Sequence, residues 1–244
     1  MTQENAVRML ESGTIPARYQ KNIGTIGVDG QLLLLKAKVA VVGAGGLGGN
    51  IIELLTRQGV GFLRIIDGDC FAGHNLNRQL LATERNLGMN KAEAAVRRIA
   101  DVNSDVVAEA VPQMLDENNA AEFLAGIEVV MDALDSLSAR RLLARTARAL
   151  KIPMIHGAIG GFTGRVTTLL PEGGADLEKL FPDNSGEVKG IESILGNPAT
   201  TPALTAALQV QEAVKVITGI GEPLDRQMLY FDTQFNLFEV LRLK

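Results

Sequence analysis

The amino-acid sequence predicts an α/β fold: a mostly parallel sheet flanked by helices, with antiparallel strands in the C-terminal part. Between residues 37 and 160, short apolar runs alternate with helical stretches, and this order requires crossover connections and a parallel sheet covered on both faces. After residue 160 the next apolar run follows through a short Gly-rich turn, which favours antiparallel pairing. The 244 residues, 46% of them hydrophobic, suffice for one core and exclude a disordered chain.

The first 36 residues are predicted to form short helices. One helix is expected over Glu4–Leu10 and a second over Asp29–Leu35. The second contains four consecutive leucines, Leu32–Leu35, which cannot share one helical stripe. We therefore expect this segment to be buried on several sides or to pack against a partner.

Strands and helices then alternate. The predicted strands are β-branched or apolar runs at Val39–Val42, Phe62–Ile66, Val106–Val111, Val129–Ala133 and Ile152–Ile159. The predicted helices lie at Ile51–Leu55, from about Asn90, at Asn118–Leu124 and at Leu137–Leu150. Gly59 is placed to end the first of these helices, and Asn90 with Glu93 resembles a capping box at the start of the second.

The pattern changes in the last third of the chain. Gly164–Leu170 is predicted to pair antiparallel with the preceding strand, and Pro171–Pro202 is a long loop, which is usually a functional feature. A helix from Pro202 to Thr218 is expected next. Two terminal strands, Gln227–Phe231 and Phe235–Leu241, complete the chain, and residues 1–244 contain no internal repeat, which indicates a single domain.

Composition excludes several classes of protein. Twenty-four basic and 28 acidic residues give a net charge of −4, so we expect no extended surface for nucleic acid or anionic lipid. A single cysteine, Cys70, excludes an internal disulfide framework and a Cys-rich zinc site. There is no secretion signal and no apolar run of about 20 residues, so a cytoplasmic protein that does not cross a membrane is expected.

A glycine motif follows the first predicted strand. Gly43, Gly45 and Gly48 form G-x-G-x-x-G, in which the glycines permit a tight turn, close phosphate approach and close helix packing, as in Rossmann-like nucleotide sites. The N–H groups and dipole of the following helix favour an anion there. Asp67 ends the next strand, where a carboxylate can accept hydrogen bonds from ribose hydroxyls. The motif is also compatible with NAD, so an NAD-binding oxidoreductase is an alternative.

Three further features favour binding of a polyphosphate. The segment Asn75–Gln79 offers amide donors and Arg78, whose guanidinium can bind phosphate bidentately. Lys91 stands in the first turn of a helix, where a cation opposes the dipole unless an anion is bound. Asp135 follows a strand at the carboxyl edge of the sheet, and a carboxylate beside phosphates suits Mg²⁺. Taken singly, each residue has another interpretation. Arg78 could be a surface ion-pair donor, Lys91 a solvated lysine, and Asp135 the N-cap of the helix that begins near Leu137.

Together these motifs resemble the ThiF/MoeB/HesA family, the bacterial relatives of ubiquitin-activating enzymes. The resemblance extends from Arg18 to Leu241. Its elements are Arg18-Tyr19, Gly30-Gln31, Gly43–Gly48, Asp67–Asp69, Asn75–Gln79, Asn90-Lys91, Asp132–Ser136, Gly164–Thr167 and the helix Pro202–Lys215.

The resemblance implies an ATP-dependent adenylyltransferase that activates the C-terminal Gly-Gly carboxylate of a small β-grasp, ubiquitin-like sulfur-carrier protein as acyl-AMP, in sulfur transfer of the molybdopterin or thiamin type. It implies ATP and Mg²⁺ as cofactors and a homodimer. It divides the chain into N-terminal helices (1–36), a nucleotide-binding region (37–160), a crossover loop (171–202) and a C-terminal helix with strands (203–244).

The residues that the resemblance assigns to ATP surround the glycine motif. They are Gly43, Gly45, Gly46, Gly48, Asp67, Asp69, Asn75, Arg78, Gln79, Lys91, Asp135 and Ser136. The catalytic set is Arg78, Lys91, Asp135 and Lys21, with Asp135 as the ligand of Mg²⁺. No protein nucleophile is required, because catalysis rests on positioning and charge neutralisation.

Three departures from the family pattern matter. Lys21 replaces a second arginine that reaches ATP from the neighbouring subunit, and lysine lacks the planar fork. The paired C-x-x-C zinc ligands are missing, so no zinc is expected. Ile194 stands where many members have a crossover-loop cysteine, which excludes covalent transfer to that position, so sulfur would be added by another protein or reagent.

Several assignments remain open from the sequence. Adenylation of a small carboxylate, as in the cyclising dehydration of a modified tRNA adenosine, is a further alternative within the family. Cys70 and His156 are interpreted as structural, and His74 as a loop residue. Arg140 has two equal interpretations, as a support for the phosphate site or as a surface helix residue.

Overall fold

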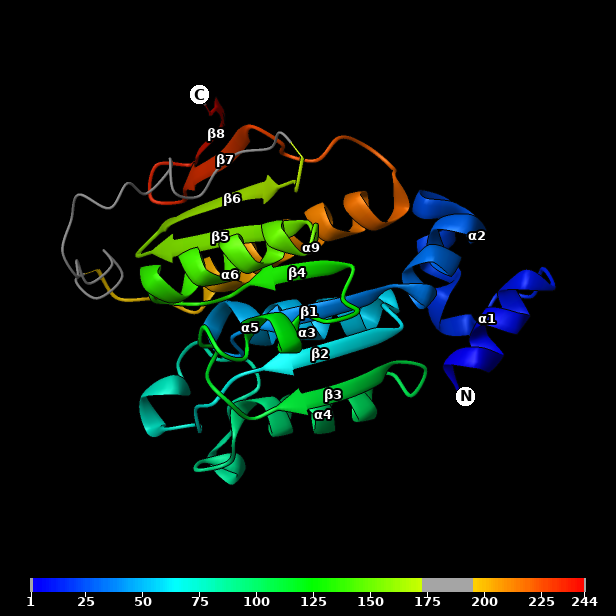
Figure 1. Ribbon diagram of the computed structural model, residues 1–244, viewed down its shortest axis with the longest axis horizontal. Coiled ribbons are helices and arrows are strands. Elements are labelled where there is room, and N and C mark those ends of the chain that lie inside the picture. The colour runs from blue at the N-terminus through cyan, green and yellow to red at the C-terminus, as the bar shows by residue number, and fades with distance from the viewer. Residues whose placement is uncertain (1, 173–194, 244) are drawn as a thin grey trace.

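A computed structural model describes residues 2–172 and 195–243 of the chain. The eight strands within these residues form one sheet in the order β3-β2-β1-β4-β5-β6-β7-β8, which crosses the molecule in Figure 1. The strands are β1 (Lys38–Val42), β2 (Phe62–Ile66), β3 (Val107–Val111), β4 (Val129–Asp132), β5 (Met154–Gly160), β6 (Thr163–Leu169), β7 (Gln227–Asp232) and β8 (Leu237–Arg242). The pairs from β3 to β5 are parallel and those from β5 to β8 are antiparallel, which confirms the predicted fold class.

Helices cover both faces of this sheet (Figure 1). The helices are α1 (Gln3–Glu11), α2 (Gln20–Lys36), α3 (Gly46–Gln58), α4 (Lys91–Val102), α5 (Ala120–Phe123), α6 (Leu137–Ala149) and α9 (Thr200–Thr218). Short 3₁₀ turns lie at Ala17–Tyr19, Gly73–Asn75 and Glu84–Asn86. Among the described helices, none is both long and apolar enough to cross a bilayer.

The two core layers follow from the alternation of side chains along each strand. Val39 and Val41 of β1 belong to the layer that contains residues of α3, α4 and α9. Ala40 and Val42 belong to the opposite layer, with residues of α5 and α6. Because both faces of β1 are covered, the strand is a continuous apolar run, as expected for a parallel sheet.

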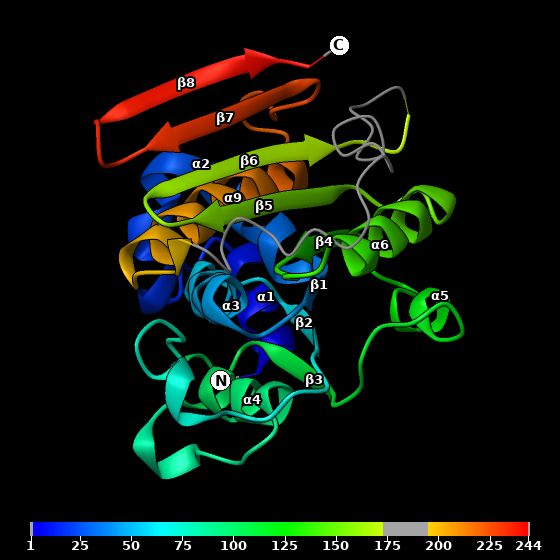
Figure 2. The ribbon, with the colours of Figure 1, turned by 90° about the vertical axis from the view of Figure 1, so that its left-hand side faces the viewer.

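The carboxyl ends of the parallel strands meet at one edge, which faces the viewer in Figure 2. Val42 at the end of β1 is in register with Ile66 of β2 and with Asp132 of β4. The residues that follow these strands therefore emerge side by side. β2 and β3 lie on one side of β1, whereas β4 and β5 lie on the other side, so the strand order reverses beside β1. Open α/β sheets bind ligands at such a point.

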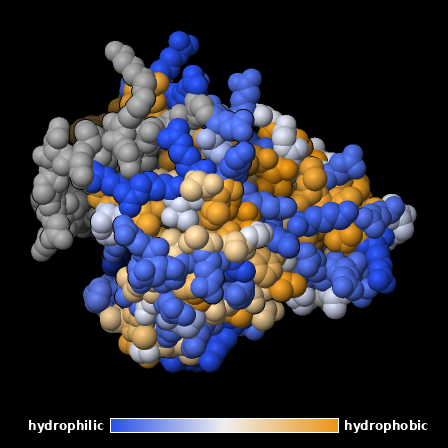
Figure 3. Space-filling view, in the orientation of Figure 1, coloured by the Kyte–Doolittle hydropathy of each residue, from blue (hydrophilic) through white to orange (hydrophobic). Residues whose placement is uncertain are grey.

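The N-terminal helix α2 is longer than the sequence predicts. It begins at Gln20 rather than Asp29 and contains one non-helical residue, Gly27 (φ 70°, ψ 178°), which glycine tolerates without strain. Of the four leucines, Leu34 and Leu35 are fully buried, whereas Leu33 is 46% exposed. Apolar side chains gather over this end of the molecule in Figure 3, so the predicted burial on several sides is only partial.

Smaller differences occur at element ends. The helix predicted over Asn118–Leu124 is a four-residue turn of α-helix, and α9 begins at Thr200, which places Pro202 in its first turn, where the missing N–H costs little. Most of the predicted loop from 171 to 202, including Ile194, lies outside the described residues.

Candidate active site

The glycine turn between β1 and α3 has the geometry that its sequence predicts. Gly43 has φ 94°, and a Cβ atom on it would lie 2.5 Å from the carbonyl oxygen of Ala133. A Cβ atom on Gly48 would lie 1.8 Å from the carbonyl oxygen of Gly43, so only glycine allows α3 to start this close to β1. Gly45 precedes α3 and provides no side-chain cap, so the first N–H groups of the helix are available to an anion.

Asp67 is bound to the glycine turn from the end of β2. Its Oδ2 accepts a hydrogen bond from the backbone N–H of Ala44 (2.7 Å), and its Oδ1 accepts one from the N–H of Asp69 (2.8 Å). Partial burial raises the pKa of Asp67, against the opposing effect of these two hydrogen bonds and of the Lys91 charge. Each carboxylate oxygen can accept a further bond, so the geometry is compatible with a ribose partner.

Lys91 is buried and ion-paired. Its Nζ lies 2.9 Å from Oδ2 of Asp69, whose side chain is 61% exposed. The side chain of Asn90 caps α4 by accepting hydrogen bonds from Ala92 and Glu93, which confirms the predicted cap. The same side chain donates to the carbonyl oxygens of Asp67 and Asp69, so it ties the start of α4 to the end of β2.

The segment Asn75–Gln79 folds back toward the glycine turn. Asn75 is buried, and its Oδ1 accepts the backbone N–H of Ala72 (2.9 Å). A Cβ atom on Gly46 would lie 3.7 Å from Cγ of Arg78, and one on Gly45 would lie 3.5 Å from Nε2 of Gln79. The structure therefore brings Arg78 and Gln79 against the two glycines that precede and begin α3.

The polar ends of these two side chains are held differently. The Nη1 atom of Arg78 donates to the carbonyl oxygen of His74 and to Oδ1 of Asn77, both at 2.9 Å. Gln79 is buried, and its Oε1 has no hydrogen-bond partner within the described part of the chain. An orphaned buried acceptor beside a glycine turn is a feature that a bound donor group would satisfy.

Asp135 lies on the turn between β4 and α6, which contacts the glycine turn through Ala133. Asp135 is exposed. The sequence allowed Asp135 to be the N-cap of α6, and the structure corrects this: the cap is Ser136, whose Oγ accepts the N–H of Ala139 (3.2 Å). The carboxylate of Asp135 is therefore not needed to cap the helix.

The donor set is compatible with Mg²⁺. Within residues 2–172 and 195–243, no group of three or more His, Cys, Asp or Glu side chains could hold a metal ion. Mg²⁺ usually binds to one or two carboxylates together with substrate phosphates and water. A single exposed carboxylate, Asp135, on the turn that contacts the glycine turn fits that description.

Lys21 lies away from this edge of the sheet in the same chain. It is exposed in the first turn of α2. Tyr19, two residues earlier, is hydrogen-bonded to Asn103 and Asp105, which connect the end of α4 to the start of β3. That connection is at the amino edge of the sheet, opposite the glycine turn, so one chain does not bring Lys21 to the other predicted residues.

Cys70 and His74 are both exposed residues near Asp69 and Arg78. The backbone of Cys70 forms an isolated β-bridge with Asn90. His74 contributes its carbonyl oxygen to Arg78 rather than its ring.

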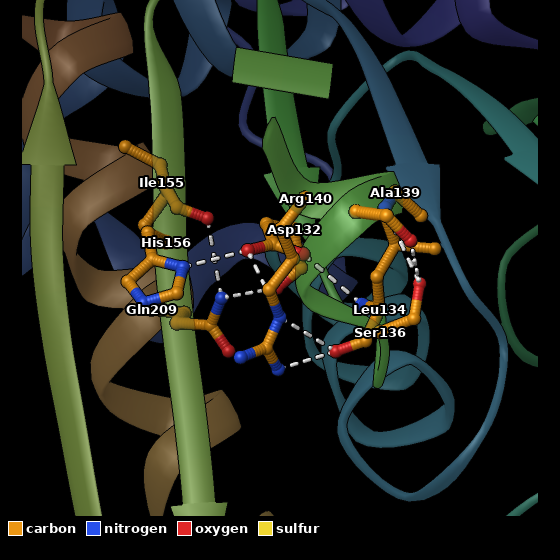
Figure 4. A network of polar contacts seen from close by, with 9 residues as sticks. Asp132, Leu134, Ser136, Ala139, Arg140, Ile155, His156 and Gln209 are labelled. Carbon is orange, nitrogen blue, oxygen red and sulfur yellow. Dashed lines mark hydrogen bonds and ion pairs between the residues drawn. The ribbon is translucent and has the colours of Figure 1, made fainter. Parts of the chain in front are cut away.

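Arg140 and His156 form a buried polar cluster that the sequence did not predict (Figure 4). Arg140 is 8% exposed, so its interpretation as a surface helix residue is wrong. Its guanidinium contacts Asp132 and the carbonyl oxygen of Leu134. Asp132 also contacts His156, whose pKa is lowered by burial against the opposing effect of Asp132. In the sequence, Asp132 belongs to the Asp132–Ser136 element of the resemblance, but no spacing connects it to His156.

Comparison with known sequences identifies the family of this chain. The sequence pattern of the ThiF family matches residues 19–244. The SAMP-activating enzyme E1 of Haloferax volcanii is 37% identical over 228 residues, covering 92% of this chain and 84% of that protein. The sulfur carrier protein adenylyltransferase of Thermus thermophilus is 36% identical, covering 93% of this chain and 87% of that protein.

More distant similarities extend to longer proteins and to solved structures. The adenylyltransferase and sulfurtransferase MOCS3-1 of Zea mays is 33% identical, and the chain spans about half its length (51%). Escherichia coli MccB superposes with a TM-score of 0.81 at 20% identity, over 98% of this chain and 78% of that one. PaaA superposes with a TM-score of 0.79 at 24% identity, over 93% of this chain and 72% of that one. At these identities the two structures establish the shared fold alone.

Proposed function

Because the chain belongs to the ThiF family, we propose that it is an ATP-dependent adenylyltransferase that activates the C-terminal Gly-Gly carboxylate of a small ubiquitin-like sulfur-carrier protein as acyl-AMP. The names of the relatives from Haloferax volcanii and Thermus thermophilus, which match most of their own length, support this activity and this class of substrate. The sulfurtransferase activity in the name of the Zea mays relative is not extended to this chain, which spans about half of that protein (51%).

The observation that carries the proposal is the convergence of five elements at one edge of the sheet. The glycine turn, the end of β2, the Asn75–Gln79 segment, the start of α4 and the turn after β4 meet there. An NAD-binding oxidoreductase would need the first two but not the cations of Arg78 and Lys91 or the carboxylate of Asp135. The set therefore favours a nucleoside triphosphate over a dinucleotide.

In this proposal the glycine turn and the N-terminus of α3 receive the phosphates of ATP, and Asp67 receives the ribose. Arg78 and Lys91 neutralise the triphosphate. Lys91 is well placed for this role because its present partner, Asp69, is largely exposed and can be solvated when Lys91 turns to phosphate. The buried Oε1 of Gln79 would accept a hydrogen bond from the nucleotide or from its bound water.

The reaction needs no protein nucleophile. A carboxylate oxygen of the carrier attacks the α-phosphorus of ATP, a bond forms between them, and the bond from the α-phosphorus to the bridging oxygen breaks. Pyrophosphate leaves with that electron pair, and acyl-AMP remains. Mg²⁺ held by Asp135 would stabilise the charge that develops on the leaving phosphates. The protein contributes position and fixed positive charge.

We also propose that the active form is a homodimer in which Lys21 reaches ATP in the neighbouring subunit. This proposal is supported by the location of Lys21 at the opposite edge of the sheet in its own chain. The carrier could belong to molybdopterin or to thiamin biosynthesis, and the proposal includes both.

Exchange of labelled pyrophosphate into ATP tests the function directly. We expect exchange only when a purified candidate carrier ending in Gly-Gly is present, and none when its last glycine is removed. Exchange that depends on modified tRNA rather than on a carrier protein would identify a small carboxylate as the substrate. Tight NAD binding without ATP binding would refute adenylation.

A further inference from the structure

Four buried polar side chains lie behind the turn that carries Asp135, and we call Asp132, Arg140, His156 and Gln209 the Asp132 cluster (Figure 4). They come from β4, α6, β5 and α9, and each is at most 8% exposed. Neither Arg140 nor Gln209 belongs to the set of residues proposed to contact ATP. The cluster therefore needs a role of its own.

Arg140 and Asp132 hold the residue that immediately precedes Asp135. The Oδ1 atom of Asp132 accepts the backbone N–H of Leu134 (3.0 Å). The carbonyl oxygen of Leu134 accepts hydrogen bonds from Nε (2.9 Å) and Nη2 of Arg140. The two side chains also form an ion pair, with 3.7 Å between Nε of Arg140 and Oδ2 of Asp132. Both backbone polar groups of Leu134 are thus fixed by one ion pair.

The other two members hold Asp132 itself. The Nδ1 atom of His156 lies 2.6 Å from Oδ2 of Asp132. The Nε2 atom of Gln209 donates to the carbonyl oxygens of Asp132 (2.9 Å) and Ile155 (3.2 Å). This contact requires a glycine at position 157, where a Cβ atom would lie 2.3 Å from the Gln209 side chain. The cluster therefore joins β4, β5 and α9 at the base of the turn.

Stability alone does not account for this arrangement. A buried ion pair contributes little net stability compared with apolar side chains of similar volume, because both charges lose their hydration. The start of α6 is already capped by Ser136. What the cluster specifies is the path of the backbone on both sides of Leu134, and so the direction in which the next side chain, Asp135, leaves the turn.

We propose that Arg140 is a positioning residue for the adenylation site, which it serves by fixing the Leu134 peptide groups so that Asp135 faces the glycine turn. The inference rests on the proposed function, since it assigns Asp135 to the metal that accompanies ATP. Substitution of groups that orient a metal ligand commonly costs about 10–100-fold in metal affinity or activity. Arg140 acts through Asp135 and does not touch the nucleotide.

Calorimetric binding of a non-hydrolysable ATP analogue, in Mg²⁺ and in EDTA, tests the inference without turnover. The ratio of the two affinities is the Mg²⁺ contribution to binding. We expect Arg140→Gln to lower this ratio about tenfold or more and to leave the affinity in EDTA nearly unchanged. Arg140→Lys keeps the buried positive charge and the aliphatic part of the side chain but loses the planar guanidinium group that donates two hydrogen bonds to Leu134. This variant should fold and should also lower the ratio.

Two comparisons make the result specific. Arg145→Gln on the same helix removes an exposed ion pair with Glu117 and should keep the wild-type ratio. Asp135→Ala should lower the ratio by itself, and adding Arg140→Gln should lower it no further, because both changes remove one effect.

The outcomes separate the inference from the function. Folded Arg140→Gln and Arg140→Lys variants with the wild-type Mg²⁺ ratio would overturn the inference and leave the function standing. Additive losses in the double variant would also overturn it, because they indicate general loosening of the site. A wild-type protein that does not bind the analogue at all would refute both.

Discussion

The backbone nitrogen of Ala44 lies 2.7 Å from Oδ2 of Asp67, so the residue proposed to bind ribose also braces the glycine turn. Substitution of Asp67 should therefore affect both folding and binding. This double role connects the end of β2 to the first turn after β1.

The first prediction concerns Asp67→Asn. An amide can accept from only one of the two backbone N–H groups and presents a donor to the other, so we expect a loss of about 1–3 kcal/mol in the free energy of unfolding. ATP affinity should fall about tenfold, which corresponds to roughly 1.4 kcal/mol. Urea unfolding and calorimetry measure the two effects. Asp29→Asn, at an exposed position of α2, is the control and should change neither.

The second prediction concerns Lys91→Met. Methionine matches the buried stem and removes the ammonium group, so pyrophosphate exchange should fall on the order of 10²-fold. The free energy of unfolding should change by less than about 1 kcal/mol, because Asp69 is exposed enough to be solvated. Lys36→Met breaks an ion pair of the same 2.9 Å length with Glu11, far from the site, and should retain exchange. Equal activity of the two variants would remove Lys91 from the mechanism.

The sequence predicts the central βα region well because its signals are local. Gly43 is required by its positive φ, Gly48 by its close approach to the carbonyl oxygen of Gly43, and Asn90 caps α4 through its nearest neighbours. The first half of α2 escaped prediction because glycines interrupt the helical pattern. Contacts beyond the local helical pattern hold that segment instead: Nδ2 of Asn22 donates to Oε1 of Gln31 in the second half of α2 and to the carbonyl oxygen of Gln58 in α3.

The glycine turn of the candidate site could be predicted from the sequence, but the buried Asp132 cluster behind it could not. Helix α6 carries several arginines, and only the sheet against which it packs determines that Arg140 points inward. Gln209 is 77 positions from Asp132, and no spacing rule connects them. Residues that act through backbone groups leave no motif, because their partner can be any residue type.

The third prediction separates Asp135 from Ser136. Asp135→Ala should abolish exchange, a loss on the order of 10²-fold or more, with an unchanged melting temperature, because the exposed carboxylate does not cap α6. Ser136→Ala should lower the free energy of unfolding by about 1 kcal/mol through loss of the cap. Near-normal exchange in Asp135→Ala would exclude this residue from the chemistry.

The fourth prediction concerns Cys70. It is exposed beside Asp69, which pairs with Lys91, but the proposed reaction forms no bond to sulfur. Cys70→Ser should therefore retain carrier-dependent exchange within about twofold, a difference of roughly 0.4 kcal/mol. A loss of exchange at unchanged melting temperature would assign a thiol role to this position.

The fifth prediction is a pH dependence of stability that arises from His156. Burial lowers the pKa of this imidazole from its usual 6.5, and the positive charges of Arg140 and Arg165 lower it further, against the opposing effect of Asp132. Below pH 6.5 the unfolded chain therefore binds a proton that the folded protein does not, so stability is lost as the pH falls through this value.

His156→Asn isolates this effect, because the Nδ2 of asparagine can replace the Nδ1–H donor to Asp132 without titrating. For each pH unit below the pKa that His156 has in the unfolded chain, the free energy of unfolding falls by up to about 1.4 kcal/mol. Between about pH 7.5 and pH 5.5 the wild type should lose about 1 kcal/mol more than the variant in urea unfolding. Parallel pH profiles for the two proteins would mean that His156 takes up a proton in the folded protein as readily as in the unfolded chain. The assignment of a neutral imidazole that donates to Asp132 would then be wrong.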